Sequence, residues 1–143
     1  TMRKITRSEL NKILKEHEKW LKSSNRLVFM LGERADLRNA DLRDMDLSNN
    51  IDLSYADLSY ADLSYSNLKY ADLSYAMLHN AYLRSANLKY ADLNGADLRD
   101  INLTNACLYG ADLSNSDLSR SVSYNTDLRE VIHFDRGELE NDD

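Results

Sequence analysis

The sequence predicts an all-β solenoid, in which short strands stack as coils along one axis, with an α-helical cap at its N-terminal end. Two patterns lead to this fold class. A five-residue pattern centred on leucine runs through residues 35–130, and an amphipathic segment with helical periodicity precedes it. Only 8% of the residues are aromatic although 43% are apolar, so we expect a core of small and aliphatic side chains.

The amphipathic segment begins at Thr6, which stands three residues before Glu9 as in a capping box, and we expect a helix to about Lys22. Its apolar side carries Leu10, Ile13, Leu14, His17, Trp20 and Leu21. We expect this side to cover the first coil, since an exposed backbone edge invites aggregation. A helix on a membrane surface is the alternative, although three glutamates interrupt its basic side. That basic side carries Lys12, Lys15, Lys19 and Lys22.

The repeat contains nineteen units of five residues. Leucine occupies the central position of every unit but one, where Ser123 stands instead. The residue two before it is alanine in twelve units, and the residue just before it is mostly Asp or Asn. A continuous helix or a flat strand would scatter leucines with this period over several sides. We therefore expect one turn in every unit, with leucine and alanine pointing inward.

One extra residue interrupts the period within Ser48-Asn49-Asn50. We expect a bulge at a corner of the coil there, because Asn tolerates left-handed backbone angles. The residues two before the leucines on either side are Met45 and Ile51, which are larger than the usual alanine. Their size suits them to fill the space that a displaced backbone leaves.

With units that read A-(D/N)-L-X-X, the sequence resembles the pentapeptide-repeat family over about two thirds of its length. The resemblance implies a right-handed quadrilateral β-helix with four units in each coil. Nineteen units would form about 4.75 coils, a rod of roughly 23 Å at the spacing of adjacent strands. We expect a capping helix and connector in residues 1–34, the β-helix in 35–130, and a C-terminal cap or dimer contact with an acidic tail in 131–143.

Charge is unevenly distributed along the chain, whose net charge is −6. Residues 1–34 carry +5, residues 35–130 carry −7 and residues 131–143 carry −4. An acidic repeat argues against direct nucleic-acid binding, which needs clustered Lys and Arg. No apolar run approaches the ~18–20 residues of a membrane span, and the first residues lack a secretory leader. We therefore expect a cytoplasmic protein without a membrane partner.

The sequence offers no catalytic or metal-binding constellation, so we expect neither an enzyme nor a cofactor. The histidines His17, His79 and His133 are dispersed in the expected fold. The single cysteine, Cys107, excludes an internal disulfide and a multi-cysteine metal site. A convex rod also provides no cleft in which a catalytic pair of carboxylates would be shielded from water.

Residues twenty apart stack in a coil of four units, and one such ladder is acidic. It consists of Asp52, Asp72, Asp92 and Asp112. This ladder is a candidate interaction face for a cation or a cationic partner; a solvated face without a ligand is the alternative. Calcium suits it poorly, because the carboxylates lie side by side instead of converging. Lys69 and Lys89, which also stack, lie just before the neighbouring corner and offset part of the charge.

Tyrosines recur two residues after leucine, at the expected corners. Tyr55 is predicted to stack on Tyr75, and Tyr70 on Tyr90, either as corner packing or as a recognition belt. Two further tyrosines occupy sides of the coil and are candidates for aromatic contact: Tyr82 and Tyr109. The apolar residues near the C-terminal end are a candidate cap or homodimer contact: Val131, Ile132 and Phe134.

These patterns favour a structural scaffold or protein-interaction module with an unknown protein partner. The alternative follows from the resemblance, since some pentapeptide-repeat proteins imitate DNA and bind bacterial type II topoisomerases, which gives quinolone resistance. B-DNA of the length of this rod carries about 13–14 negative charges. The repeat carries a net −7, about half that density, so the scaffold is the favoured hypothesis.

Overall fold

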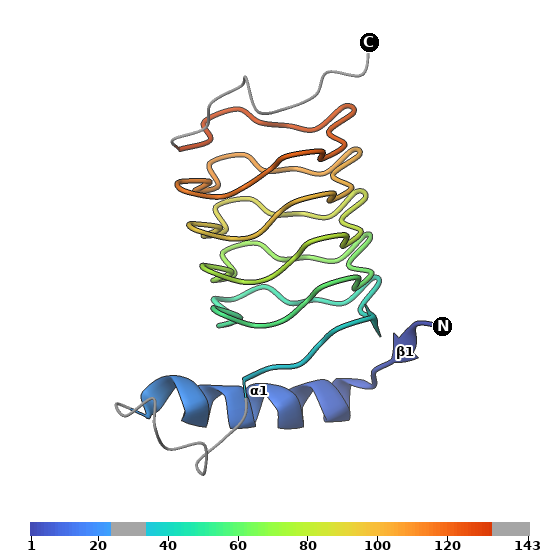
Figure 1. Cartoon of the computed structure of the whole chain (residues 1–143), viewed down its shortest axis with the longest axis vertical. Coiled ribbons are helices and arrows are strands. Elements are labelled where there is room, and N and C mark those ends of the chain that lie inside the picture. Colours follow the sequence, from blue (N-terminus) through green and yellow to red (C-terminus); the bar gives the residue numbers. More distant parts are fainter. Residues whose placement is uncertain (24–33, 133–143) are drawn as a thin grey trace.

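The structure is a computed structural model that describes residues 1–23 and 34–132. Strand β1 (Arg3–Lys4) and helix α1 (Arg7–Lys22) precede a rod of stacked coils, and α1 lies across one end of that rod (Figure 1). Strand β2 (Ala40–Asp41) lies in the first coil and pairs in parallel with β1. Within the described part of the chain, no helix is both long enough and apolar enough to cross a membrane.

Each repeat unit forms one short side of a coil and one turn. The residue before each leucine makes a parallel bridge to its counterpart in the next coil, as Asp52 does with Asp72. The Leu53 N–H donates to the Asp72 carbonyl at 2.8 Å, and the Ala56 N–H donates to the Leu53 carbonyl at 3.0 Å, which closes the turn. After the extra residue, bridged residues stand twenty apart, so four units make one coil as predicted.

Every unit turns through a corner residue with left-handed backbone angles. Six of these corners are tyrosines, with φ between 56° and 62°: Tyr55, Tyr60, Tyr65, Tyr70, Tyr75 and Tyr90. Such angles usually cost a residue with a side chain about 1–2 kcal/mol. Bonds between coils offset this cost, since the Tyr55 N–H donates to the Ser74 carbonyl at 2.9 Å. Asn49 and Asn50 are both left-handed, with φ of 67° and 57°, which confirms the predicted bulge.

The core is a column of leucines with alanines beside it. The predicted register holds, because the stacked leucines are at most 2% exposed: Leu53, Leu73, Leu93 and Leu113. A buried serine in an alanine position is tolerated where its hydroxyl is bonded, as Ser66 is to the Leu63 carbonyl at 2.7 Å. Near the last described coil, the buried Ser121 hydroxyl has no partner among the described residues, and Leu128 is only half-buried. Packing therefore loosens toward that end.

Helix α1 covers the first coil with its apolar side, and Leu10 is fully buried there. The helix begins at the predicted capping box, in which the Glu9 N–H donates to the Thr6 hydroxyl oxygen and the Thr6 N–H donates to the Glu9 carboxylate. Just inside the helix, Arg7 donates to the Asp46 carbonyl at 2.8 Å, which satisfies a carbonyl at the end of the rod. Strand β1 covers another part of this edge and was not predicted, because a two-residue polar strand leaves no periodic signal.

Candidate functional site

The predicted aspartate ladder forms one continuous side of the rod, here called the acidic face. Parallel bridges connect its aspartates in the order Asp52, Asp72, Asp92 and Asp112. The first and third are exposed, whereas the second and fourth are half-buried, which is less exposure than the sequence predicted. The same strands contribute Ser54, Ser74, Asn94 and Ser114, so these four strands carry no basic side chain. Nearby, Lys69 places its ammonium group over the Tyr70 ring, 4.8 Å from the ring centre.

A structural bond explains why most strands carry Asp or Asn just before the leucine. The Ser54 N–H donates to Asp52 Oδ1 at 3.0 Å, and the Ser54 hydroxyl donates to the same oxygen at 2.7 Å. The same two bonds recur at Asp72. Asparagine serves equally well on another side of the rod, where the Thr104 N–H donates to Asn102 Oδ1 at 3.0 Å. The backbone N–H therefore gains the same acceptor from asparagine as from aspartate, so this bond does not need a charge.

The next side of the coil also carries aspartates, yet each of them lies within 4 Å of an arginine. This side is here called the arginine face, and its charged residues are Asp36, Arg38, Asp57, Asp97, Arg99 and Asp117. The Arg38 guanidinium binds both carboxylate oxygens of Asp36, at 2.9 and 2.7 Å. These bonds lower the pKa of Asp36 to about 2. Arg99 binds Asp97 in the same way, with both distances 2.7 Å.

Two columns of tyrosine rings border the acidic face, one at each of its corners. The predicted stacks are confirmed: Tyr55 lies on Tyr75 with 5.1 Å between ring centroids, and Tyr70 lies on Tyr90 with 5.4 Å. These four rings are between 36% and 52% exposed. Each column ends on a glycine, Gly95 or Gly110, where an added Cβ would lie 2.6 Å from the tyrosine ring of the preceding coil. The glycines therefore make room for the last ring of each column.

The two tyrosines predicted as single contacts lie in different surroundings. Tyr82 is 47% exposed and stands two units away from the acidic face within the coil. Tyr109 is half-buried, because it packs edge-on against Tyr90 with centroids 5.6 Å apart. The Arg129 guanidinium also lies over the Tyr109 ring, at 5.8 Å. Tyr109 thus adjoins one tyrosine column, whereas Tyr82 is separate from both.

The candidate dimer contact is only partly described. Val131 is half-buried, and Ile132 is 46% exposed and bridges to Asp112. Ile132 therefore continues the acidic face with an apolar side chain. Phe134 and the acidic tail lie outside the described residues.

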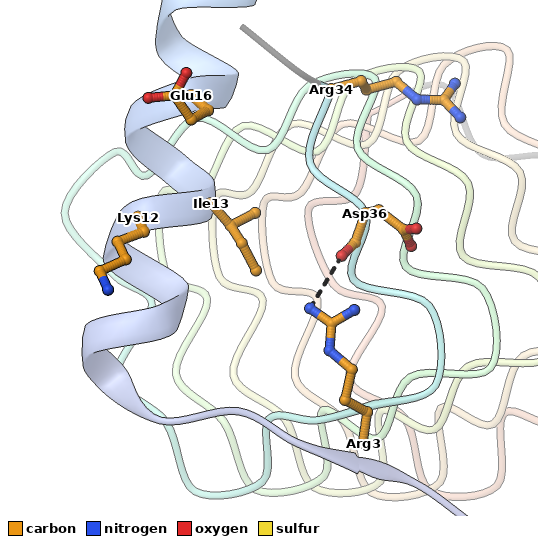
Figure 2. A pocket seen from close by; sticks show the side chains of 6 residues that line it. All are labelled: Arg3, Lys12, Ile13, Glu16, Arg34 and Asp36. Atoms are coloured by element: carbon orange, nitrogen blue, oxygen red, sulfur yellow. Dashed lines mark hydrogen bonds between the residues drawn. The ribbon is translucent and has the colours of Figure 1, made fainter.

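A cavity of about 360 Å³ lies between α1 and the first coil (Figure 2). Its lining consists of Arg3, Lys12, Ile13, Glu16, Arg34 and Asp36. The Arg3 guanidinium donates to the Asp36 carbonyl at 3.4 Å, so β1 is tied to the first coil by a side chain as well. Sequence reasoning missed this cavity, because it forms only when the helix packs on a coil that comes later in the chain. The basic charge of residues 1–34 was the only signal of its lining.

Known proteins share both the repeat and the fold of this chain. A family model described as pentapeptide repeats matches residues 51–89 and 81–120. HetL, a pentapeptide-repeat protein involved in heterocyst differentiation regulation in the cyanobacterium Nostoc sp. strain PCC 7120, is 34% identical with a TM-score of 0.67, over 70% of this chain and 47% of HetL. The protein alr5209 from the same Nostoc strain is 30% identical over 88% of each chain, with a TM-score of 0.33. This chain belongs to the pentapeptide-repeat family.

Other comparisons add the fold but no activity. QnrB1, a plasmid-mediated fluoroquinolone resistance protein, matches in a trypsin-treated form with a TM-score of 0.55 and 23% identity, over 67% of this chain and 52% of QnrB1. That likeness shows the pentapeptide-repeat fold alone. This chain spans about half the length of HetL and of QnrB1. No curated protein matches the sequence significantly.

Within residues 1–23 and 34–132 of this pentapeptide-repeat protein, the closest approach to a catalytic arrangement is a Ser-His-Asp cluster on the arginine face. His79 Nδ1 lies 3.3 Å from the Ser59 hydroxyl and 3.4 Å from Asp97 Oδ2. A catalytic triad needs its serine and its carboxylate at different ring nitrogens, whereas both contact Nδ1 here. Among the residues that the structure describes, no group of three or more His, Cys, Asp or Glu side chains is arranged to hold a metal ion.

Proposed function

We propose that this protein is a non-enzymatic interaction scaffold, a right-handed four-sided rod of about 4.75 coils whose acidic face binds a basic region of another protein. One observation carries the proposal. Asn102 shows that an asparagine side chain accepts the same bond from a backbone N–H, yet all four positions of the acidic ladder are aspartate. The charge of this face is therefore additional to what the fold needs, and binding a cationic partner is a use for it.

Electrostatics and aromatic surface both favour such a partner. Stacked carboxylates about 4.8 Å apart repel one another, and the strands of the acidic face carry no base that would offset the repulsion. Lys or Arg side chains of a partner relieve it, most strongly at low ionic strength. The exposed tyrosine columns add the aromatic surface that is enriched in protein interfaces. Lys69 over the Tyr70 ring illustrates that these corners accept a cation.

The shape of the acidic face favours a macromolecule over a small ligand. Four stacked aspartates extend over about 14 Å on the outside of a rod, whereas small-molecule sites are concave. HetL, a relative from the same family, is described as involved in the regulation of heterocyst differentiation. A regulatory role of that kind is compatible with a protein that acts by binding.

The test compares two double variants that change net charge equally. Asp72→Asn/Asp92→Asn removes charge from the acidic face and keeps the side-chain acceptors, and Asp97→Asn/Asp117→Asn does the same on the arginine face. Proteins from the source cell are captured on each variant at low and high salt, and the affinity of the captured basic protein is then measured with purified components. We expect about a tenfold loss for the acidic-face variant and for high salt, with little loss for the control.

Equal binding by the two variants, or binding that does not weaken with salt, would overturn the assignment of the acidic face. Either result would leave the family and the fold untouched, because both variants retain the backbone hydrogen bonds between coils and one side-chain oxygen at each changed position.

The C-terminal end supports a second proposal, a homodimer through Val131, Ile132 and Phe134. The exposed Ile132 side chain at the last described coil favours this contact. Ile132→Arg is expected to convert the dimer to monomers in sedimentation experiments. A wild-type protein that stays monomeric at all concentrations contradicts this proposal.

We do not extend the proposal to DNA mimicry and topoisomerase binding. The repeat carries a net −7 against about 13–14 charges for B-DNA of the same length, and the likeness to QnrB1 is one of fold. Inhibition of gyrase at low salt, weakened by Asp72→Asn/Asp92→Asn, is the result that would reverse this choice.

A further inference from the structure

A buried histidine connects helix α1 to the first repeat unit. His17 is fully buried, and its Nδ1 accepts a hydrogen bond from the Ala35 N–H at 3.1 Å. Ala35 opens the repeat, and its N–H lies at the end of the rod, where no earlier coil supplies an acceptor. Because Nδ1 accepts this bond, the proton of the neutral imidazole must be on Nε2.

The other ring nitrogen makes no well-formed hydrogen bond within the described part of the chain, although the Ser54 backbone lies near enough to favour a proton on the ring. Nε2 is buried and has no hydrogen-bond partner among the described residues. The ring stacks on Trp20, with 5.7 Å between centroids, and Trp20 in turn contacts Tyr55 edge-on at 6.2 Å. A buried donor without a partner is costly, so packing alone does not explain a histidine here. The neutral imidazole nevertheless suits this place, since its one acceptor nitrogen, Nδ1, is bonded to the Ala35 N–H.

Protonation reverses the chemistry of the bond to Ala35. The imidazolium ion carries a proton on both nitrogens, so Nδ1 becomes a donor that faces the Ala35 N–H donor. The cation would also be enclosed by the surfaces that bury the neutral ring. Two charged groups act on it: Asp52 favours the cation and Arg34 opposes it. Burial has the largest effect and lowers the pKa of His17 from its usual 6.5, although the Ser54 backbone and the charge of Asp52 both favour the cation.

We propose that His17 is a pH-sensitive latch, which holds α1 on the first coil while its imidazole is neutral and releases the helix when the imidazole is protonated. Release uncovers the Ala35 N–H and separates Trp20 from Tyr55, the first ring of a tyrosine column. The proposal is independent of the partner assigned to the acidic face.

The direction of the pH dependence follows from proton binding. The released helix exposes a histidine with an ordinary pKa, whereas the docked helix holds one with a lowered pKa. The open form therefore binds more protons, so docking is at full strength above about pH 6.5 and weakens as the pH falls below it. The ratio of open to docked helix rises by up to about tenfold for each pH unit, until the pKa of the docked histidine is reached.

The chain has an internal probe of this event, because Trp20 is its single tryptophan and stacks on His17. Fluorescence is recorded from about pH 8 to about pH 5, together with amide exchange in α1. We expect a reversible change in fluorescence and faster exchange in α1 at the acidic end. Exchange in the central coils should not follow this change.

Variants separate the latch from general acid effects. His17→Asn keeps an acceptor near the position of Nδ1 but does not titrate, so the fluorescence change should vanish. His17→Phe removes the acceptor, and α1 should exchange faster at every pH. His79→Asn is the matched control and should leave the wild-type change in place. A transition that persists in both His17 variants, or wild-type exchange in α1 that is the same at both ends of the pH range, overturns the proposal.

Discussion

The acidic face and the arginine face both carry aspartate at the same position of the repeat unit. In both, an aspartate stands just before the buried leucine and accepts a hydrogen bond from the N–H two residues later, as Asp52 and Asp36 do. The difference lies in that later residue, which is Ser54 on one face and Arg38 on the other. Arginine binds the carboxylate through two bonds, whereas serine adds one hydroxyl and leaves the charge in place. One outward residue per unit therefore decides the electrostatics of a face without any change in the backbone.

The largest effect is expected from a substitution in the core, because unfolding destroys both faces together. Leu73→Asp places a carboxylate in the leucine column, and it should destabilise the protein by more than about 4 kcal/mol, because apolar burial is lost and a charge is buried unpaired. Thermal unfolding followed by circular dichroism measures this loss. Asp72→Asn, one residue away but pointing outward, is the control and should melt near the wild type. Cooperative melting of Leu73→Asp at the wild-type temperature would contradict the predicted core.

An intermediate loss of stability is expected at the glycine that makes room for a tyrosine column beside the acidic face. Gly95→Ala adds a Cβ that would lie 2.6 Å from the Tyr75 ring, so the ring must move; we expect a loss of about 1–2 kcal/mol. Ser85→Ala is the matched control, because Ser85 has a similar corner conformation, with φ of 57°, and already carries a Cβ. Chemical denaturation measures both, and near-ultraviolet circular dichroism reports the tyrosine stack. Equal stability of the two variants would show that the glycine is not needed.

The smallest effect concerns acid stability and distinguishes faces with arginine from the acidic face. Arg38 and Arg43 lower the pKa values of Asp36 and Asp41 to about 2, so these ion pairs stabilise the fold above the unfolded value near 4. Their contribution is lost as the pH falls from about 4 to about 2. Arg38→Gln/Arg43→Gln should therefore melt slightly below the wild type at neutral pH, and the two melting temperatures should converge near pH 2. A difference in melting temperature that stays constant across this pH range would contradict the proposed contribution of the two ion pairs.

Much of the fold was predictable because one period sets many contacts at once. A residue and its counterpart twenty positions later must stack, which yielded the leucine column, the aspartate ladder and both tyrosine stacks. Left-handed tyrosines were not predicted, because tyrosine has no intrinsic preference for that conformation. It is imposed by the hydrogen bonds between coils. Strand β1 and the bond from Arg7 to the Asp46 carbonyl were also missed, since they join segments that no repeat relates.

The candidate site shows the same limit on a smaller scale. Its aspartates and its bordering tyrosines followed from spacing, but the contacts at the ends of the columns did not. Spacing alone did not indicate that Gly95 and Gly110 accommodate tyrosine rings from the preceding coil. Trp20 was predicted on the apolar side of a cap, yet it also extends a tyrosine column by its contact with Tyr55. Side-chain packing across coils depends on rotamers, which a positional pattern does not encode.

The corner at Asn49 and Asn50 shows how this rod accepts an insertion. Bridges on either side of it remain in register, although they join residues twenty-one apart before the extra residue and twenty apart after it. Two successive left-handed residues take up the additional length, so every later leucine still points inward. Peptides could therefore be grafted at this corner without disturbing the winding of the chain. Because the corner directly precedes Asp52, a grafted loop would project beside the acidic face and make its binding specificity open to design.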